Sequence, residues 1–429
     1  MKALLCAILT LCSIPLVALA EKQAQPEKKI TPGGRLDAII TKNLKAQGLK
    51  PNPMSSDEIF VRRIHLDIIG RVPTKQETVK FLRDPAKNKR ARLVDELLAS
   101  EGYVHNFYNY WADLLRAKTQ ISGAGNSQPA GYAYHDWIKN ALRKNMPYDE
   151  MVRELVTARG QSWDNGAIGY YLRDYGMPLD NLAITTQVFL GTQIVCAQCH
   201  NHPFDSWTQM DYYHLSAFTF GQLTSNASMN TQGELRSYKD VEERRRMGRA
   251  VSEILKPLRF NNVVETERKL RLPHDYQYSD AKPKAVVKPA VPWSKGPKKP
   301  SKMTKPPIEE FAAWLTAEEN PRFTRVIANR LFKKAMGRGV IEPVDDMRDD
   351  TKPSNPELMA FLERRMQTVG YDMKKFLRTI YLSKSYQREA SPAEVQPGEQ
   401  YHFQGPILRR LSAEQIWDSL VAMVIDNAD

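Results

Sequence analysis

The segment Ile194–Trp207, with the sequence IVCAQCHNHPFDSW, carries the residue types best suited to chemistry. Two residues separate Cys196 from Cys199, and His200 follows at once. This is the spacing of covalent haem c attachment. Two thiols three positions apart on a turn can reach both vinyl groups of one porphyrin, and the adjacent histidine then lies beneath the iron. The spacing therefore predicts a haem c site made of these three residues.

The sixth iron ligand has candidates on the segment that follows. His202 is too close in sequence to His200 to reach the opposite face of the haem. His214 and Met210 lie on a predicted helix beyond Pro203, where a bend could fold that helix over the other face. We rank His214 first, Met210 second and an open position third. Two strong ligands favour electron transfer, whereas an open position permits small-molecule chemistry.

Two other interpretations of the same segment stay open. Cys196 and Cys199 could bind zinc or iron with two further ligands, because zinc accepts mixed sulfur and nitrogen ligands. The pair could instead form a short disulfide or a redox-active dithiol at a helix end. The residues that could complete a metal site are His200, His202, Asp205 and His214.

A second charged cluster lies in the segment EPVDDMRDD, which places four aspartates within six residues. Calcium prefers such oxygen ligands, but the spacing differs from that of an EF-hand loop and Arg348 lies among the acids. We expect a structural role in which these carboxylates pair with nearby arginines. The aspartates are Asp345, Asp346, Asp349 and Asp350, and the candidate arginines are Arg322, Arg325, Arg330 and Arg338.

The first twenty residues have the features of a secretory signal peptide. Lys2 precedes an apolar run over 3–17, and Ala18–Ala20 forms a small-x-small cleavage site. This run is shorter than a membrane span, and we expect no transmembrane segment in the mature chain. The sequence thus predicts a signal peptide at 1–20 and a periplasmic or secreted protein that begins near Glu21.

The net charge of +13 arises mainly from one segment. Residues 281–307 contain eight lysines, seven prolines and no acidic residue, so the rest of the mature chain carries only +4. Proline disfavours regular structure and like charges repel, which predicts a disordered basic linker. Such a linker could also bind an anionic surface or an acidic polysaccharide. We expect no nucleic-acid partner, because the protein is predicted to be exported.

The elements that must position these residues are predicted to be helices, and the fold class is mainly α. Before the linker, residues 35–260 form one predicted helical domain. Helices are expected at 36–48, 55–70, 74–84, 89–100, 102–118, 127–145, 146–160, 179–200, 208–221 and 239–256, with a short hairpin near 259–272.

Capping signals support several of these boundaries. Thr74 with Glu77 and Thr208 with Asp211 fit capping boxes. An aromatic stripe at positions 103, 107, 110 and 111 falls on one helix face, which is typical of core. We interpret His65 and His135 as surface or structural histidines.

After the linker, residues 308–429 form a second predicted helical domain. Asn355 before Pro356 predicts a helix start, as does Asp372 after Gly370. A capping box at Ser412 predicts a last helix from residue 413.

These motifs together resemble the planctomycetal cytochrome-like proteins, whose two domains are of unknown function. The first domain is indicated by LDAIITKNLKAQGL, VRRIHLDIIGRVPT, RLVDELLASEGY and FLGTQIVCAQCHNHPFDSWTQMDYYHLSAFTF. Its companion is indicated by NPRFTRVIANRLFKKAMGRGVIEPVDDMRDDTKPSNPELM and RRLSAEQIWDSL. Relatives usually continue well past the last motif, so we expect a truncated or short companion domain.

The resemblance implies an exported, mostly helical bacterial protein. Together with the C-x-x-C-H motif, it predicts a haem c-binding redox or electron-transfer protein with a redox partner protein. The alternative is an exported, non-catalytic binding or scaffold protein whose cysteine–histidine cluster holds a structural metal or a disulfide. A hydrolase that uses the histidine–aspartate cluster is a weaker third hypothesis.

Overall fold

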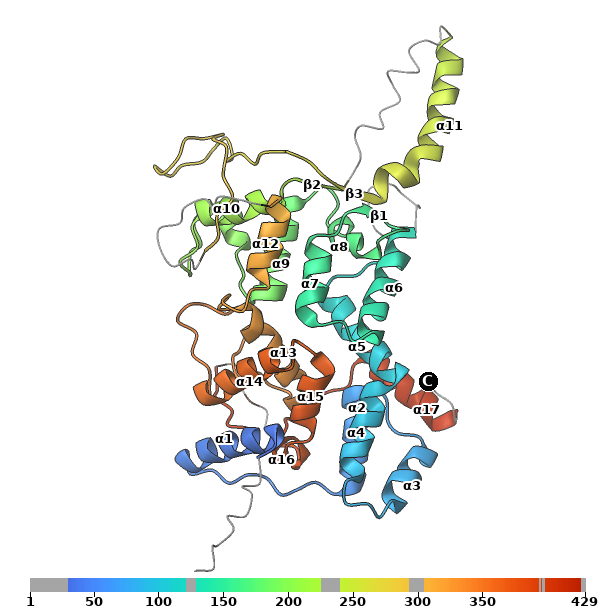
Figure 1. The fold of residues 1–429 in the computed structure, drawn as a ribbon, viewed down its shortest axis with the longest axis vertical. Coiled ribbons are helices and arrows are strands. Elements are labelled where there is room, and N and C mark those ends of the chain that lie inside the picture. The colour runs from blue at the N-terminus through green and yellow to red at the C-terminus, as the bar shows by residue number, and fades with distance from the viewer. Residues whose placement is uncertain are drawn as a thin grey trace, which may run out of the picture. The chain divides into compact units, whose positions relative to one another are not determined.

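The computed structural model describes residues 30–120, 129–224, 240–292 and 305–425, apart from 393–394 and 396–397. The predicted signal peptide lies outside the described residues. Helix accounts for 55% of the structure and strand for 4%, which confirms the mainly α fold (Figure 1). Within the described part of the chain, no helix is both long and apolar enough to cross a bilayer.

The N-terminal half is a succession of helices at the predicted places, with ends that shift by a few residues. Their bounds are α1 (Pro32–Ala46), α2 (Asp57–Ile68), α3 (Lys75–Arg83), α4 (Lys89–Ala99), α5 (Glu101–Leu114), α6 (Pro129–Arg143) and α7 (Tyr148–Val156). The predicted capping box at α3 is present, because Thr74 accepts from the Glu77 N–H and Glu77 accepts from the Thr74 N–H.

The aromatic stripe of α5 is core, as predicted. Tyr103, Phe107 and Trp111 are at most 1% exposed. The Trp111 ring lies 5.4 Å from the ring of Tyr148 on α7, which in turn stacks 5.3 Å from Phe323. Because Phe323 belongs to the C-terminal half, this row of rings joins the cores of the two halves.

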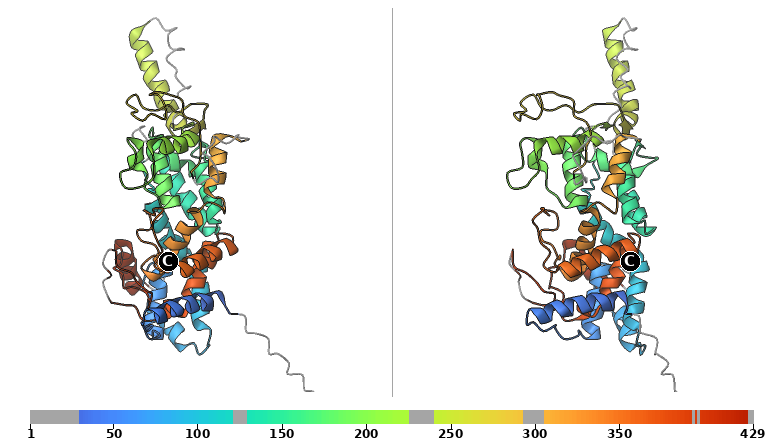
Figure 2. Two further views of the ribbon diagram at one scale, coloured as in Figure 1. Left: turned by 90° about the vertical axis from the view of Figure 1, so that its left-hand side faces the viewer. Right: turned by 60° about the vertical axis from the view of Figure 1, so that its left-hand side comes forward.

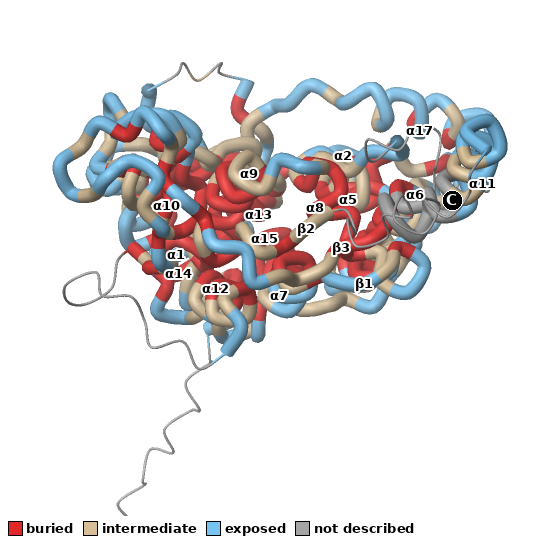
Figure 3. The backbone as a smooth tube through the Cα atoms, turned by 90° about the horizontal axis from the view of Figure 1, so that it is seen from above, coloured by how far each residue is buried: buried red, intermediate tan, exposed pale blue. Residues whose placement is uncertain are grey.

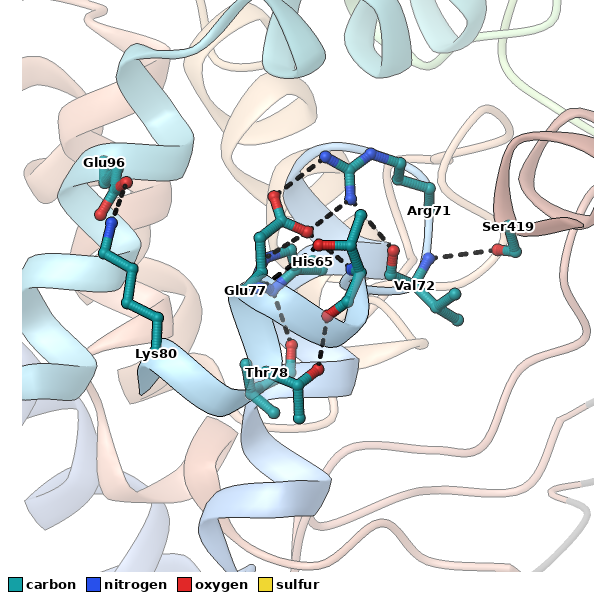
Figure 4. A network of polar contacts seen from close by, with 10 residues as sticks. His65, Arg71, Val72, Glu77, Thr78, Lys80, Glu96 and Ser419 are labelled. Atoms are coloured by element: carbon teal, nitrogen blue, oxygen red, sulfur yellow. Dashed lines mark hydrogen bonds and ion pairs between the residues drawn. The ribbon is translucent and has the colours of Figure 1, made fainter. Parts of the chain in front are cut away.

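His65 on α2 is structural, but it is buried and not on the surface. Figure 4 shows it within a network of polar contacts. Its Nδ1–H donates to the Val61 carbonyl at 2.8 Å, and its Nε2 lies 3.9 Å from a Glu77 oxygen. Arg71 donates twice to Glu77, and the Val72 N–H donates to Ser419 at 3.2 Å. This network joins α2 and α3 to the last helix of the chain.

The middle of the chain contains short elements as well as helices. They are β1 (Gly160–Gln161), η1 (Gly166–Ile168), α8 (Gly169–Leu172), α9 (Pro178–Leu190), η2 (Val195–Gln198), α10 (Gln209–Thr219), β2 (Gln222–Leu223), α11 (Val241–Phe260) and β3 (Asn262–Glu265). β3 pairs antiparallel with β1 on one side and β2 on the other, in the order β1-β3-β2. The expected hairpin is therefore wrong in its partners, because β3 pairs with two strands from earlier in the chain.

Three helices of the C-terminal half begin at the predicted starts. Its helices are α12 (Pro307–Leu315), α13 (Phe323–Met336), α14 (Pro356–Thr368), α15 (Met373–Tyr381), α16 (Lys384–Gln387) and α17 (Ala413–Val424). Asn355, Asp372 and Ser412 are the N-caps of α14, α15 and α17, and each side chain accepts a backbone N–H. These three capping predictions are confirmed.

Helices from opposite ends of the sequence pack together. Figure 1 and Figure 2 show α1 beside α14, α15 and α16, and α9 contacts α13 in the same way. The buried apolar side chains form one continuous core. Figure 3 shows buried backbone segments in both halves. Residues from 32 onward form one compact unit, and the predicted division into two domains stays a prediction.

The first part of the predicted basic linker is ordered. The Leu272 N–H donates to the Ala285 carbonyl and the Val287 N–H donates to the Leu270 carbonyl, both at 2.9 Å. Val287 is buried in the core. Residues 281–292 therefore differ from the disordered segment that composition predicts, because backbone pairing holds them to a neighbouring segment. Residues 293–304 lie outside the described residues.

Candidate functional site

The C-x-x-C-H turn follows a helix that ends earlier than predicted. α9 stops at Leu190, and Gly191 takes the left-handed conformation with φ 58°. A Cβ at position 191 would lie 2.8 Å from Val326 and 3.0 Å from the Val344 carbonyl oxygen. Glycine is therefore required here for its conformation and for its small size. The predicted continuous helix over 179–200 is wrong for this reason.

The two cysteines lie on η2 and at its end. A 3₁₀ helix has three residues per turn, so side chains three positions apart lie on the same side. Cys196 and Cys199 are both exposed and both free thiols. The Cys199 N–H donates to the Cys196 carbonyl at 3.2 Å, which closes this turn. The arrangement presents both thiols together to solvent.

His200 is exposed directly after the second thiol. Its Nδ1 lies 2.7 Å from the Asn201 carbonyl oxygen. Because a carbonyl oxygen only accepts, Nδ1 carries the proton and the neutral ring keeps its lone pair on Nε2. This hydrogen bond fixes the tautomer that can coordinate a metal through Nε2.

His202 and Asp205 both accept hydrogen bonds from nearby backbone N–H groups, unlike His200, whose ring donates. The Phe204 N–H donates to His202 Nδ1 at 3.2 Å, so neutral His202 carries its proton on Nε2. The Ser206 N–H donates to Asp205 at 2.7 Å. His202 therefore offers no free lone pair unless this hydrogen bond breaks. Over the residues that the structure describes, no three His, Cys, Asp or Glu side chains are grouped closely enough to hold a metal ion.

Polar side chains beneath the turn hold its backbone. Gln209 Nε2 donates to the Gln198 carbonyl at 3.1 Å, and the Gln209 N–H donates to the Asn201 side chain at 2.9 Å. The Asn201 N–H in turn donates to the hydroxyl of Tyr278 at 2.7 Å. Gln209 is 2% exposed, so its hydrogen bonds to the turn are made from a buried position. The turn is thus fixed before any group binds to it.

α10 starts as predicted, with the Thr208–Asp211 capping box present. His214 on this helix donates through Nδ1 to the Lys288 carbonyl at 2.7 Å. Tyr212 and Tyr213 on α10 both interact electrostatically with Cys199. The pKa of the Tyr213 hydroxyl is raised, mainly by burial and to a smaller extent by Cys199. Successive residues of a helix point about 100° apart, so His214 faces a different direction from Tyr213. Its role as sixth ligand stays a prediction, as does that of Met210.

The apolar residues near the turn divide into two groups. Val195 is 53% exposed and Phe204 is 76% exposed, so both present apolar surface to solvent within the segment that carries the thiols. Ile194, Trp207 and Phe218 are buried in the protein core. Their burial there leaves Val195 and Phe204 as the apolar contacts that a bound group could gain.

The acidic segment of the C-terminal half reaches this site. The Met347 N–H donates to the Gly191 carbonyl at 2.6 Å, and Gln187 donates to Asp345 at 3.0 Å. Asp349 lies 3.5 Å from the Ser206 hydroxyl at the other end of the loop. The segment therefore contacts both the entry to the turn and the exit from it.

The predicted Asp–Arg pairing is correct for one pair. Asp349 accepts from Arg322 at 2.7 Å, and Arg322 is buried. Asp346 pairs with Arg348, within the segment itself. Arg325 pairs instead with Glu363, while Arg330 and Arg338 donate to backbone carbonyls. The structural interpretation therefore rests on Asp349 and not on Asp345 or Asp346.

Sequence reasoning missed Tyr278, Gln209 and Asp349 as parts of the site. Gln209 had a signal, since it lies at the first turn of a helix that follows the motif directly. Tyr278 and Asp349 come from segments that are distant in sequence. No local pattern indicates that they return to the turn.

The fold and the site define a mainly helical protein with a solvent-exposed C-x-x-C-H turn. Residues 35–224 match a family model described as a protein of unknown function (DUF1549), and residues 309–427 match another described as a protein of unknown function (DUF1553). The chain therefore contains two domains of unknown function, consistent with a two-domain protein of planctomycete type. No curated protein and no solved structure matches it.

Proposed function

We propose that the chain is an exported haem c-binding protein that transfers electrons, with Cys196, Cys199 and His200 as the attachment site. One observation carries this proposal. Two exposed free thiols lie on one side of a 3₁₀ turn, directly before a histidine whose Nε2 lone pair is free. This is the donor set that covalent haem attachment needs, and its support from Gln209 is independent of the haem.

The residues would act as follows. Cys196 and Cys199 would each hold the haem by a thioether bond, in which the thiol sulfur joins one vinyl carbon and its hydrogen joins the other. His200 would be an iron ligand, and its hydrogen bond to the Asn201 carbonyl would hold the ring in place. The exposed side chains of Val195 and Phe204 would gain apolar contacts with the bound haem. Bound haem c would supply one-electron redox chemistry.

The exposure of the turn favours electron transfer with a partner protein. Cys196, Cys199 and His200 all lie at the surface, so a redox partner could approach them directly. The sixth position would go to His214, to Met210 or to no protein ligand. His214 donates its Nδ1–H to the Lys288 carbonyl, so its neutral ring, like that of His200, keeps the Nε2 lone pair for a ligand.

The alternative is a structural metal or a disulfide at the same residues in a binding or scaffold protein. A zinc or iron site that uses His202 requires its Nδ1 to give up the Phe204 N–H. A disulfide between Cys196 and Cys199 would need no other residue. A metal site that uses His202 would be lost when His202 is replaced, whereas a haem site or a disulfide would not. The experiment below therefore includes a His202 variant.

The test is mass spectrometry of protein exported in a host with a haem-attachment system, followed by a pyridine haemochrome spectrum. We expect a mass increase of one haem, and its loss when Cys196 and Cys199 are both replaced by Ser. Both thiols are exposed, so this variant should fold. His200→Ala should change the visible spectrum, whereas His202→Ala should retain both the haem and the spectrum. Protein without haem that holds zinc, or a Cys196–Cys199 disulfide, would overturn the proposal.

A further inference from the structure

A cavity of about 270 Å³ lies where α2 meets the segment 406–411. Two pairs of consecutive arginines from opposite ends of the chain line it, Arg62 with Arg63 and Arg409 with Arg410. Asp67 is the single carboxylate among the described lining residues. We call this cavity the arginine crevice. Its lining carries four positive charges against one negative charge.

Arg63 and Arg409 are fixed by contacts with the protein. Arg409 pairs with Asp67 and donates to the Lys334 carbonyl. Arg63 donates to the Arg388 carbonyl at 2.8 Å, and its guanidinium lies 4.9 Å from the ring centre of Tyr386. Arg63 Nε is buried without a hydrogen-bond partner in the described structure. These contacts hold two guanidinium groups in place.

Arg62 and Arg410 are free to bind a ligand. Arg62 and Arg410 are exposed, and neither has an ion pair or hydrogen bond from its side chain to any described residue. The acidic residues four positions away along the chain are engaged elsewhere. The hydrogen bond of Glu58 to Ser56 lowers the pKa of Glu58, and Glu414 is bound to Ser412 in the same way.

The single carboxylate cannot neutralise this cluster. Asp67 is 7% exposed and already accepts from Arg409 on one oxygen and from Tyr386 at 2.7 Å on the other. Lys334 lies close enough that burial, together with the Arg409 charge, lowers its pKa to about 8. An uncompensated positive potential therefore remains in the crevice.

We propose that the arginine crevice binds an oxyanion, a carboxylate or a phosphate monoester, that carries an apolar group. The planar guanidinium fork matches both anions with two parallel hydrogen bonds. Ile59 is 48% exposed and Leu408 is 63% exposed, so the same cavity offers apolar contact beside the charges. Arg63 and Arg409 would orient the anion, and Arg62 and Arg410 would close on it.

This site is separate from the C-x-x-C-H turn. It unites the two arginine-containing motifs VRRIHLD and RRLSAEQ, which play no part in the proposed haem attachment. Each motif alone has one arginine pair, and only the packing of α2 against 406–411 brings the pairs together. The inference therefore does not depend on whether haem is attached.

The experiment is isothermal titration of the full chain at low salt with phenyl phosphate, inorganic phosphate and benzoate. We expect saturable 1:1 binding, with phenyl phosphate tighter than inorganic phosphate, and the comparison with benzoate identifies the preferred anion. The double variant Arg62→Gln/Arg410→Gln should bind at least tenfold more weakly. Since both side chains are exposed, circular dichroism should show an unchanged fold.

The matched control is Arg83→Gln/Arg364→Gln, which removes the same charge from two exposed arginines elsewhere. We expect its affinity to stay within twofold of the unsubstituted protein. An equal loss in both double variants would show general charge attraction and overturn the proposal. Titrations without saturation for all three ligands would also overturn it.

Discussion

Glu77 should stabilise the fold through its charge, and Glu77→Gln tests this. The carboxylate accepts from Arg71 at 2.8 and 3.0 Å and from the Thr74 N–H at 2.7 Å (Figure 4). Burial opposes ionisation, but the hydrogen bonds from Arg71 and Thr74 and the Arg71 charge outweigh it and lower the pKa of Glu77 from 4.5 to about 2. Glutamine can still serve in a capping box, so the substitution removes mainly the charge.

The expected loss follows from this pKa. A carboxyl group gains about 1.36 kcal/mol for each unit by which folding lowers its pKa, which gives about 3 kcal/mol for Glu77. The side chain is 34% exposed. Solvent screening therefore reduces the contribution to roughly 1.5–2 kcal/mol. Arg71 is only 4% exposed, so it would be left as a buried cation without this partner charge.

The contribution of Glu77 to stability should decrease as the pH falls. Because the folded pKa is below the unfolded value, the stabilisation is present above about pH 4.5 and is lost as the pH falls toward 2. Urea unfolding should show Glu77→Gln less stable by roughly 1.5–2 kcal/mol at pH 7, with the two proteins converging near pH 2. The control is Glu96→Gln, whose carboxylate pairs with Lys80 at 3.4 Å in an exposed position. It should differ little from the unsubstituted protein at any pH.

Two results would refute this reasoning. One is a difference between the Glu77 variant and the unsubstituted protein that stays the same from pH 7 to pH 3, since a lost charge must act in a pH-dependent way. The other is an equal effect of Glu96→Gln. That outcome would mean that the net charge of the chain, and not the buried network, controls stability.

Two further predictions concern the support of the turn. Asp349→Asn should lower the thermal unfolding temperature, because buried Arg322 loses its ion pair, while Asp350→Asn at the exposed neighbouring position should leave it unchanged; equal shifts would contradict the structural role of Asp349. Gly191→Ala should destabilise the protein by roughly 1–3 kcal/mol, since its φ is 58° and the new Cβ would lie 2.8 Å from Val326. Chemical denaturation measures this loss, and an unchanged midpoint would contradict the required left-handed conformation.

Helix starts could be predicted because their chemistry is local. A side-chain oxygen reaches an N–H two or three residues ahead, so the signal lies within four residues. The N-caps Thr74, Thr208, Asn355, Asp372 and Ser412 all occur as the sequence indicates. The aromatic stripe of α5 was predictable for a related reason, since helical period alone places its residues on one face.

The end of α9 could not be predicted in the same way. The apolar pattern continues from 179 to 200, so periodicity favours an unbroken helix. The chain instead leaves the helix at Gly191, where Val344 and Met347 of the C-terminal half approach closely. Contacts from a segment about 150 residues away thus accompany the end of this helix, and tertiary packing overrides a local pattern.

β1 and β2 lacked a sequence signal because they are too short. β1 and β2 contain two residues each, and alternation needs at least four to be recognised. The same limit applies to the ordered part of the predicted linker. Its lysine and proline content indicates disorder, while a few backbone hydrogen bonds to 270–272 hold it in place.

The C-terminal half contributes to the turn as well as to the core. Met347 binds Gly191 just before the turn, and Asp349 lies against Ser206 just after it. Asp349 is itself held by Arg322 at the start of α13. A change in the position of α13 would therefore move both ends of the loop that carries the cysteines. This coupling gives a physical reason for the two domains of unknown function to occur in one chain, because the second helps to position the chemically competent residues of the first.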